Sequence, residues 1–289
     1  MVQIGITERG DAALDNGWKP WVEKGLPAIL ITKDPVKLIN ENPLLFSKSN
    51  RQGNVILHAT ITGMGGYAIF EKNVPHWYKT LSELKRILKN PDFDRSRIVI
   101  RQDPIFVPFL IAMGNGSLDL SMNIPQFAKE YGLRYRMSFL DMYPHVKARL
   151  QEACQKLDEE EDKMRAEIAK GGGALIVNHE HPHAVELYNK IIKLQPEMHL
   201  ALNTRLEFLE LLKKKTGLTD DEIEICGEPG LKCTGCLSKR DLDTFGIELD
   251  KDPETGFQRP ACACLGIKKE LLTNKHRCKH QCVYCFWKD

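Results

Sequence analysis

Short hydrophobic runs that end in polar residues recur along the first two thirds of the chain. They are rich in β-branched residues and too short for helices, which is typical of strands covered on both faces of a sheet. The runs are Val2–Ile6, Ala28–Ile31, Val55–Ile61, Ile98–Ile100, Arg134–Phe139 and Glu222–Cys226. We therefore predict six strands, each followed by a polar strand end.

Helical patterns separate these runs. In the segment Val74–Leu88, apolar residues recur at three- and four-residue spacing, which indicates an amphipathic helix. A regular succession of strand and helix favours a parallel sheet covered by helices. Six such units predict an α/β fold in the form of a partial or open (β/α) barrel, rather than the complete eight-fold barrel.

Two helical segments interrupt this succession. The segment His145–Lys170 is rich in charge and contains neither proline nor glycine, so it predicts a long solvated helix that ends at the glycines 171–173. A second helical stretch runs from Ala184 to about Lys215. We interpret residues 145–216, approximately, as a helical insertion that carries no catalytic residues.

The last part of the chain has a different character. After Cys226 the periodicity fades, and cysteine, glycine, lysine and proline take over. We predict a barrel over residues 1–226 and a cysteine-rich, metal-binding tail over residues 227–289. Because such a tail has little hydrophobic core of its own, a metal site would order it.

Composition and charge exclude several classes of protein. Hydrophobic residues are 42% of the 289 residues and charged residues are 28%, as in an ordinary globular protein rather than a disordered or collagen-like one. The sequence has no run of about 18 apolar residues, as a membrane span requires, and its start lacks a signal-peptide pattern. The net charge of +2 gives no overall nucleic-acid signature. We expect a cytoplasmic protein without a membrane partner.

Cysteine is the unusual residue type. The chain has nine cysteines, of which Cys154 falls in the predicted charged helix and eight lie between Cys226 and Cys285. An odd count in a large chain without an export signal argues against a disulfide framework. In a reducing compartment, clustered cysteines are typical of metal sites.

The last three cysteines form a closely spaced triplet. Cys278, Cys282 and Cys285 have the spacing C-x3-C-x2-C, and Tyr284 directly precedes the third. Three thiolates on one tight loop can bind three corners of a four-iron cluster and leave the fourth iron open to a small molecule. The alternative is structural zinc, which takes four ligands, with His276 or His280 as the fourth.

The triplet and its tyrosine resemble the cluster loop of radical SAM enzymes. In that family the open iron binds the amino and carboxylate groups of S-adenosylmethionine, and an electron from the cluster cleaves the cofactor to a 5′-deoxyadenosyl radical. The resemblance implies a 4Fe-4S cluster, S-adenosylmethionine, an electron donor and hydrogen abstraction from an unknown substrate. Radical SAM enzymes carry the triplet after their first barrel strand, whereas only four residues follow Cys285 here. The resemblance therefore implies a permuted strand order.

The chain also resembles a bacterial and archaeal domain-of-unknown-function family whose carboxy-terminal cysteine cluster is similar to that of radical SAM proteins. The resemblance covers most of the chain except roughly residues 145–216. The matching pieces are Arg9, Asp11, Thr32–Pro35, Thr62–Gly63, Glu71–Pro75, Arg101–Ile105, Ser138–Tyr143, Cys226, Cys233, Gln258–Arg259, Cys262–Cys264 and the final triplet. This resemblance implies an architecture and a cluster but no reaction.

The other tail cysteines predict a second metal site. The resemblance favours Cys226, Cys233, Cys262 and Cys264 as its ligands and leaves Cys236 as a spare. Spacing alone favours the pair Cys233 and Cys236 together with the pair Cys262 and Cys264, as a zinc site. Two interpretations stay open: an auxiliary iron–sulfur cluster, and a zinc or iron–sulfur centre that only orders the tail.

Polar residues at the strand ends are candidates for the active site, because parallel α/β barrels place their active sites there. The candidates for cofactor and substrate binding are Glu8, Arg9, Asp11, Lys33, Arg101 and Asp103, with Thr7, Thr32, Ser138, Asp141 and Glu228 nearby. Arg101 and Lys33 would hold a carboxylate or phosphate. Glu8, Asp11 or Asp103 would accept hydrogen bonds from a ribose or an ammonium group.

Three functional hypotheses follow. The first is a radical SAM-like enzyme, and the second is a non-enzymatic zinc or iron–sulfur module that binds a protein or nucleic-acid partner. The third is work on nucleic acid, by analogy with the DNA-lesion lyases among radical SAM enzymes, which a basic tail permits (Lys268, Lys269, Lys275, Arg277 and Lys279). The histidine-rich tract 179–183 is either a further metal site or the start of a surface helix.

Overall fold

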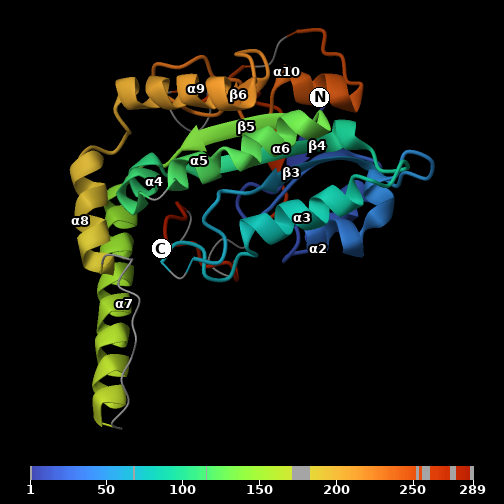
Figure 1. Cartoon of the computed structure of the whole chain (residues 1–289). Coiled ribbons are helices and arrows are strands. Elements are labelled where there is room, and N and C mark those ends of the chain that lie inside the picture. The colour runs from blue at the N-terminus through green and yellow to red at the C-terminus, as the bar shows by residue number, and fades with distance from the viewer. Residues whose placement is uncertain are drawn as a thin grey trace.

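Seven parallel strands form one sheet in the computed structural model of the chain, which describes residues 2–67, 69–114, 116–170, 183–251, 254–255, 261–273 and 278–286 (Figure 1). The strands are β1 (Ile4–Ile6), β2 (Pro27–Thr32), β3 (Asn54–Thr60), β4 (Ile98–Ile105), β5 (Arg134–Phe139), β6 (Ile223–Ile225) and β7 (Lys268–Glu270). Their order is β6-β5-β4-β3-β2-β1-β7, with every neighbouring pair parallel. The six predicted strands and the open α/β architecture are confirmed.

Helices cover one face of this sheet. Alternate strand residues, such as Leu30 and Leu57, point into a large buried hydrophobic cluster on that side. The covering helices are α1 (Lys19–Val22), α2 (Pro35–Glu41), α3 (Trp77–Ile87), α6 (Asn123–Tyr131) and α9 (Leu202–Thr216). The helix predicted at Val74–Leu88 is α3, which begins two residues after Pro75. Short 3-10 turns, η1 (Pro43–Phe46) and η2 (Arg95–Arg97), complete this layer.

The opposite face of the sheet is covered by the tail. Ile29, Ile31 and Ile56 pack there against α10 (Lys239–Phe245) and against four tail cysteines. The helix α10 begins with a capping box, in which Ser238 and Asp241 each accept a backbone N–H of the other. The tail also supplies β7, which pairs with β1 along the edge of the sheet. The tail therefore covers one face of the sheet and also supplies its edge strand beside β1.

A buried group of charged side chains joins the sheet to α10. Arg136 on β5 is fully buried and donates hydrogen bonds to Glu224 on β6 and to Asp241 on α10. His58 on β3 lies beside them, and burial followed by the charge of Arg136 lowers its pKa to about 4. The imidazole is therefore neutral near pH 7, and Arg136 balances the two carboxylates together with Arg134, which pairs with Glu224 at 2.8 Å and with Asp241 at 2.9 Å.

The long charged helix is confirmed as α7 (Pro144–Lys170), and it extends away from the rest of the protein (Figure 1). Its predicted end at glycines 171–173 lies outside the described residues. The stretch predicted from Ala184 to Lys215 is two helices, α8 (Ala184–Leu194) and α9, since Pro196 follows α8 and interrupts the helical pattern. Helix α8 packs on α7 and on α4 (Val107–Met113), which leads into α5 (Ser117–Ser121).

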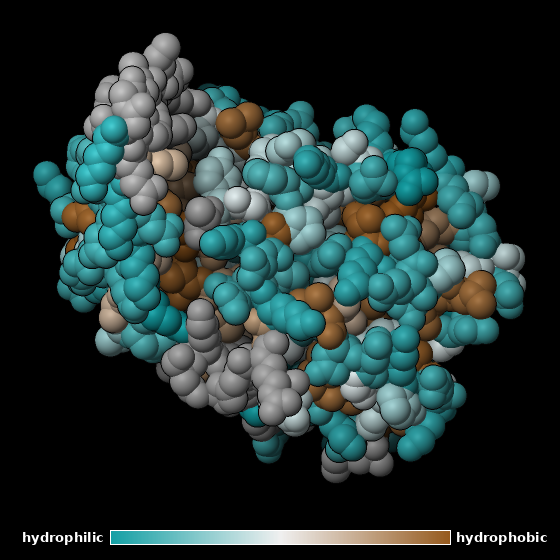
Figure 2. Space-filling view, turned by 90° about the horizontal axis from the view of Figure 1, so that it is seen from below, coloured by the Kyte–Doolittle hydropathy of each residue, from teal (hydrophilic) through white to brown (hydrophobic). Residues whose placement is uncertain are grey.

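The face of the protein shown in Figure 2 is predominantly polar. Figure 2 shows hydrophilic side chains over most of the face seen from below, with hydrophobic side chains exposed in separate patches. Exposed single hydrophobic residues, such as Leu44 and Tyr78, are normal on protein surfaces. Among the described helices, none has both the length and the apolar character needed to cross a membrane.

Candidate functional site

The cysteine triplet lies on one tightly folded loop, which we call the cluster loop (residues 278–285). The N–H of Gln281 donates to the carbonyl of Cys278 at 3.3 Å, and the N–H of Cys285 donates to the carbonyl of Cys282 at 3.1 Å. Gln281 has a positive φ of 51°, which is uncommon for a residue with a side chain. These two successive turns bring the three thiols near enough that each influences the ionisation of another.

A buried ion pair holds the middle of the cluster loop to the end of β1. His280 Nε2 lies 2.9 Å from Asp11 Oδ2, and both side chains are about 95% buried or more. Burial disfavours both charges, but the contact between them raises the pKa of His280 and lowers that of Asp11. His280 Nδ1 lies 3.1 Å from the carbonyl of Asn73. Both ring nitrogens of His280 thus have partners within the protein, and His276, the other histidine considered as a fourth ligand, lies outside the described residues.

A second buried group holds the end of the loop to β2. Lys33 Nζ donates to the Tyr284 hydroxyl at 2.7 Å and pairs with Glu71, which also accepts from Tyr284. Burial raises the pKa of Cys282 to about 12, and the ammonium group of Lys33 opposes this rise. The charge of Lys33 favours the Cys282 thiolate, whereas burial and the carboxylate of Glu71 disfavour it. Glu71 is 1% exposed and also accepts from Thr62 at 2.7 Å.

Three further hydrogen bonds join backbone groups of the cluster loop to the rest of the protein. The N–H of Val283 donates to the carbonyl of Phe70 at 3.0 Å. Asn73 Nδ2 donates to the carbonyl of Lys279 at 2.9 Å, and Arg149 on α7 donates to the carbonyl of Cys285 at 2.6 Å. The loop that follows β3 and the start of α7 thus hold the triplet at the carboxyl end of the sheet.

The other tail cysteines come together on the sheet face covered by α10. Cys236 Sγ lies 2.9 Å from Cys264 Sγ. Cys226 and Cys262 belong to the same buried cluster as these two residues. The resemblance left Cys236 as a spare, but its thiol lies within this group. Cys233, which the resemblance favoured as a ligand, packs instead against the hydrophobic cluster on the other face of the sheet, and its Sγ lies 3.1 Å from the backbone nitrogen of Glu228.

Candidate residues at the strand ends lie between the two thiol groups. Arg101 pairs with Asp103, which also accepts a hydrogen bond from Ser138 at 2.6 Å. The charge of Arg101 acts on Cys226 and Cys236, and the charge of Asp103 acts on Lys33 and Tyr284. The charged side chains at the strand ends therefore act electrostatically on residues of both groups.

Strand β7 brings further charged residues to this region. Lys268 Nζ lies 2.9 Å from Glu8 Oε2 and 3.6 Å from Cys236 Sγ. Glu270 accepts hydrogen bonds from the backbone nitrogens of Glu8 and Arg9 at 3.1 and 3.0 Å. Burial raises the pKa of Glu8. Of the sequence candidates, Glu8, Asp11, Lys33, Arg101 and Asp103 have side-chain partners in this region, and Arg9 is held by its backbone hydrogen bond to Glu270.

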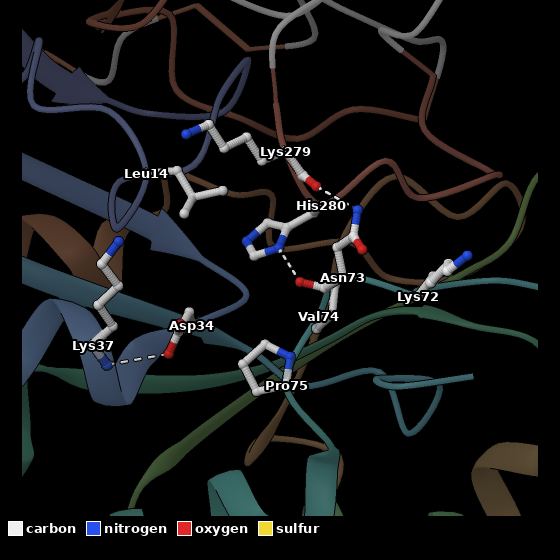
Figure 3. Close-up of a pocket in the computed structure, with 9 residues that line it drawn as sticks. All are labelled: Leu14, Asp34, Lys37, Lys72, Asn73, Val74, Pro75, Lys279 and His280. Carbon is white, nitrogen blue, oxygen red and sulfur yellow. Dashed lines mark hydrogen bonds between the residues drawn. The ribbon is translucent and has the colours of Figure 1, made fainter. Parts of the chain in front are cut away.

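A cavity of about 550 Å³ opens beside the cluster loop (Figure 3). Its lining combines lysines with the loop that follows β3: Leu14, Asp34, Lys37, Lys72, Asn73, Val74, Pro75, Lys279 and His280. Asp34 caps α2 by accepting the N–H of Lys37 at 3.2 Å, as its position before Pro35 indicates. The cavity gives the buried cluster loop a positively charged outer side.

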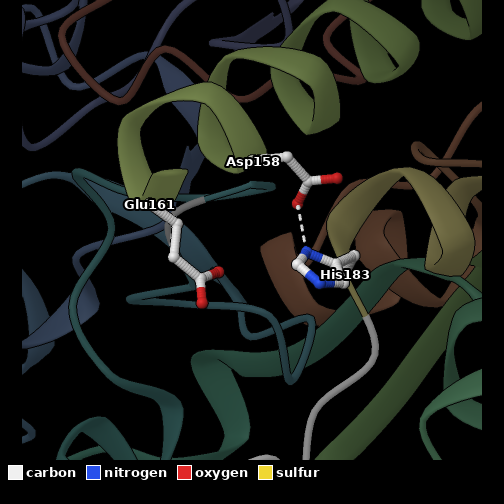
Figure 4. Close-up of side chains that lie close together, drawn as sticks. All are labelled: Asp158, Glu161 and His183. Carbon is white, nitrogen blue, oxygen red and sulfur yellow. Dashed lines mark ion pairs between the residues drawn. The ribbon is translucent and has the colours of Figure 1, made fainter. Parts of the chain in front are cut away.

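A third group of metal-ligand types joins α7 and α8. Ligand atoms of Asp158, Glu161 and His183 lie within 4.8 Å of one another (Figure 4). Asp158 accepts the backbone N–H groups of Ala184 and Val185 at 2.7 and 3.0 Å, so it caps α8. The positive end of a helix disfavours a cation, and capping accounts for this group. Residues 179–182 of the histidine-rich tract lie outside the described residues.

Several site residues cannot be identified from the sequence. Glu71 lies in a matching segment without an assigned role. Lys268 and Glu270 lie in the tail, where the periodicity fades and no strand is predicted. Tyr284 was assigned beside the cluster, but its hydrogen bonds could not be foreseen. Glu71 gives no local sequence signal, because its partners Lys33 and Tyr284 lie far from it in the sequence.

Comparisons with known proteins identify one relationship. A model of the family described as a domain of unknown function (DUF1848) matches residues 27–287. Searches of curated proteins and of solved structures find no match. The matched range includes β2 to β7, both thiol groups and the cluster loop. The chain therefore belongs to the DUF1848 family of domains of unknown function.

Proposed function

We propose that this protein is a radical SAM-type iron–sulfur enzyme in which Cys278, Cys282 and Cys285 bind a four-iron cluster. The observation that carries the proposal is the donor set: three thiols on one loop, whose only described histidine, His280, has both ring nitrogens engaged by Asp11 and Asn73. Three protein ligands leave one iron for S-adenosylmethionine. When bound, the cluster supplies the electron that cleaves this cofactor to a 5′-deoxyadenosyl radical.

The sheet topology supports the proposal. Strand β7 lies beside β1, and the cluster loop follows β7 in the sequence. When the strands are counted from β7, the order β7-β1-β2-β3-β4-β5-β6 is a simple parallel succession with the triplet after its first strand. Radical SAM enzymes, which the triplet resembles, have that arrangement. The permuted order implied by the resemblance is consistent with this sheet.

The chain's own residues would shield and charge-balance the thiolates. Lys33 places its ammonium group against Tyr284 and near Cys282, inside a pocket closed by Glu71. Cys282 and Tyr284 are each less than 10% exposed, so water is largely excluded from this side of the loop. Exclusion of water protects reactive species from side reactions.

Arg101 is the residue best suited to hold a carboxylate of the cofactor or substrate. Its Nε is buried and has no hydrogen-bond partner among the described residues, while the same guanidinium pairs with Asp103. A buried donor without a partner costs free energy, which a bound carboxylate would recover. Glu8 and Asp103 would accept hydrogen bonds from ammonium or hydroxyl groups of the ligand.

The proposal is tested by the metal content of protein purified and reconstituted without oxygen. We expect about four iron and four sulfide ions per chain, a broad visible absorption band, and an electron paramagnetic resonance signal of the reduced protein that changes when S-adenosylmethionine is added. Zinc in the cluster loop without iron would contradict the enzyme proposal and would favour a non-enzymatic metal-binding module.

We expect the ion pair between Asp11 and His280 to slow the loss of iron from the cluster loop. In Asp11→Asn the carboxylate is lost while the shape is kept, which weakens a buried charged hydrogen bond by about 1–3 kcal/mol. We expect iron loss to a chelator to accelerate about tenfold or more, because each 1.4 kcal/mol is a factor of about ten. The measurement is the decay of the visible absorption band after chelator is added.

Asp34→Asn is the matched control for this prediction. Asp34 lies at the same cavity but caps α2, and asparagine caps helices about as well as aspartate. Its iron should leave at the wild-type rate. Equal rates in wild type and Asp11→Asn would mean that this ion pair does not hold the cluster loop.

A further inference from the structure

Four thiols from separate parts of the tail meet on the sheet face covered by α10. Cys226 directly follows β6, Cys236 precedes α10, and Cys262 and Cys264 precede β7. Cys236 Sγ lies 2.9 Å from Cys264 Sγ, and Cys226 and Cys262 lie in the same buried cluster as this pair. Chance would not bring four cysteines together from segments up to 38 residues apart, so their common position needs an explanation.

We propose that Cys226, Cys236, Cys262 and Cys264 bind one tetrahedral zinc ion as a closed structural centre. Zinc–sulfur bonds of about 2.3 Å place neighbouring sulfurs about 3.8 Å apart. The Sγ atoms of Cys236 and Cys264 lie 2.9 Å apart, so this pair needs only a small expansion to reach that geometry. A four-iron cluster would instead hold its ligands apart with its own iron and sulfide atoms, so the contacts favour a single ion.

The surroundings are those of a closed site. All four cysteines are less than 10% exposed, and they pack with Leu237, Leu242 and strand isoleucines. A structural zinc site has four protein ligands and no open position. No substrate role is therefore assigned to this centre.

Charged and polar groups around the thiols suit a negatively charged tetrathiolate. Lys268 Nζ lies 3.6 Å from Cys236 Sγ, and the charge of Arg101 acts on Cys226 and Cys236. The N–H of Cys236 donates to Cys264 Sγ at 3.1 Å. Such outer contacts orient metal ligands and balance their charge.

The ligand-bearing segments are packed backbone against backbone. Gly235 has a φ of 78°, and a Cβ at this position would lie 2.7 Å from the carbonyl carbon of Ala263. The segment around Cys236 can thus approach Cys262 and Cys264 only because residue 235 is glycine. The ion would fasten the end of β6 to the segment that leads into β7, which are the two edges of the sheet.

Zinc content tests the inference without reference to the enzyme proposal. In protein produced with zinc, we expect about one tightly bound zinc per chain in the wild type and in Cys282→Ala, which lacks a ligand of the cluster loop. Cys236→Ser and Gly235→Ala should lose this zinc, whereas Gly246→Ala, a positive-φ glycine with open space around it, should keep it. Iron in place of zinc in Cys282→Ala, or full zinc retention in Cys236→Ser, would overturn the inference.

A second measurement covers variants that fail to fold. Wild-type protein in which cobalt replaces zinc should show the visible absorption of tetrahedral Co(II) with sulfur ligands. Cys154→Ser should show the same spectrum, because Cys154 lies in α7, outside the group. A spectrum typical of octahedral cobalt would contradict a tetrathiolate site.

Discussion

Replacing Cys282 with alanine is expected to remove the iron–sulfur cluster and to abolish formation of 5′-deoxyadenosine. Cys282 is the central thiol of the triplet, and it is 6% exposed. A four-iron cluster held by three thiolates cannot be retained by the two that remain, at the partly exposed positions 278 and 285. We expect iron to fall from about four per chain to well below one, and product to fall to the level of a sample without protein.

Cys154→Ala is the matched control. Cys154 belongs to the same buried hydrophobic cluster as Cys282, and burial raises its pKa to about 12, so its thiol is neutral. Losing one buried sulfur costs about 1 kcal/mol and should leave iron content and product formation unchanged. If Cys282→Ala keeps its iron, the cluster is bound elsewhere and the assignment of the triplet is wrong.

Arg136→Met is expected to cause the largest loss of folding stability, about 3–5 kcal/mol. Arg136 is 0% exposed, and its removal would leave the carboxylates of Glu224 and Asp241 buried without their main counter-charge. Burial alone would raise the pKa of Glu224, but the charges of Arg136 and of Arg134 outweigh this effect and lower the pKa to about 2. The measurement is the free energy of unfolding in urea at pH 7.

The loss of folding stability in Arg136→Met should depend on pH. A carboxyl whose folded pKa lies below its ordinary value of 4.5 stabilises the fold above that value, and the contribution is lost as the pH falls toward the folded pKa of about 2. The difference between wild type and Arg136→Met should therefore be largest near neutral pH and should shrink between about pH 4.5 and 2.

Arg240→Met separates this buried interaction from a surface one. Arg240 lies 3.4 Å from the same Glu224, but its side chain is 47% exposed. Exposed ion pairs contribute about 0–1 kcal/mol, so this variant should resemble the wild type. Equal stability of Arg136→Met and wild type would mean that the charged group does not hold α10 to the sheet.

The strands were predictable where hydrophobic residues mark them. Strands β1 to β6 follow the apolar runs, and α7 follows from a segment without proline or glycine. Strand β7 could not be recognised, because its sequence Lys268–Glu270 is entirely charged, as edge strands often are. Helix α10 is short, and its capping residues, Ser238 and Asp241, were a signal that could have been used.

The site was predictable only in part, because its residues are far apart in the sequence. The triplet was evident from spacing, and Asp11 and Lys33 from their places after β1 and β2. Their partners were not, since 269 residues separate Asp11 from His280 and 251 separate Lys33 from Tyr284. Local patterns cannot reveal such pairs. They depend on β7 turning the tail back toward β1.

Formation of 5′-deoxyadenosine tests the central claim most directly. Reconstituted protein would be incubated without oxygen with S-adenosylmethionine and a strong reductant, and the products would be separated and identified by mass. We expect 5′-deoxyadenosine that requires both the reductant and an intact triplet, and that is absent with Cys282→Ala. Unchanged S-adenosylmethionine in a sample that holds a complete four-iron cluster would contradict the radical SAM proposal.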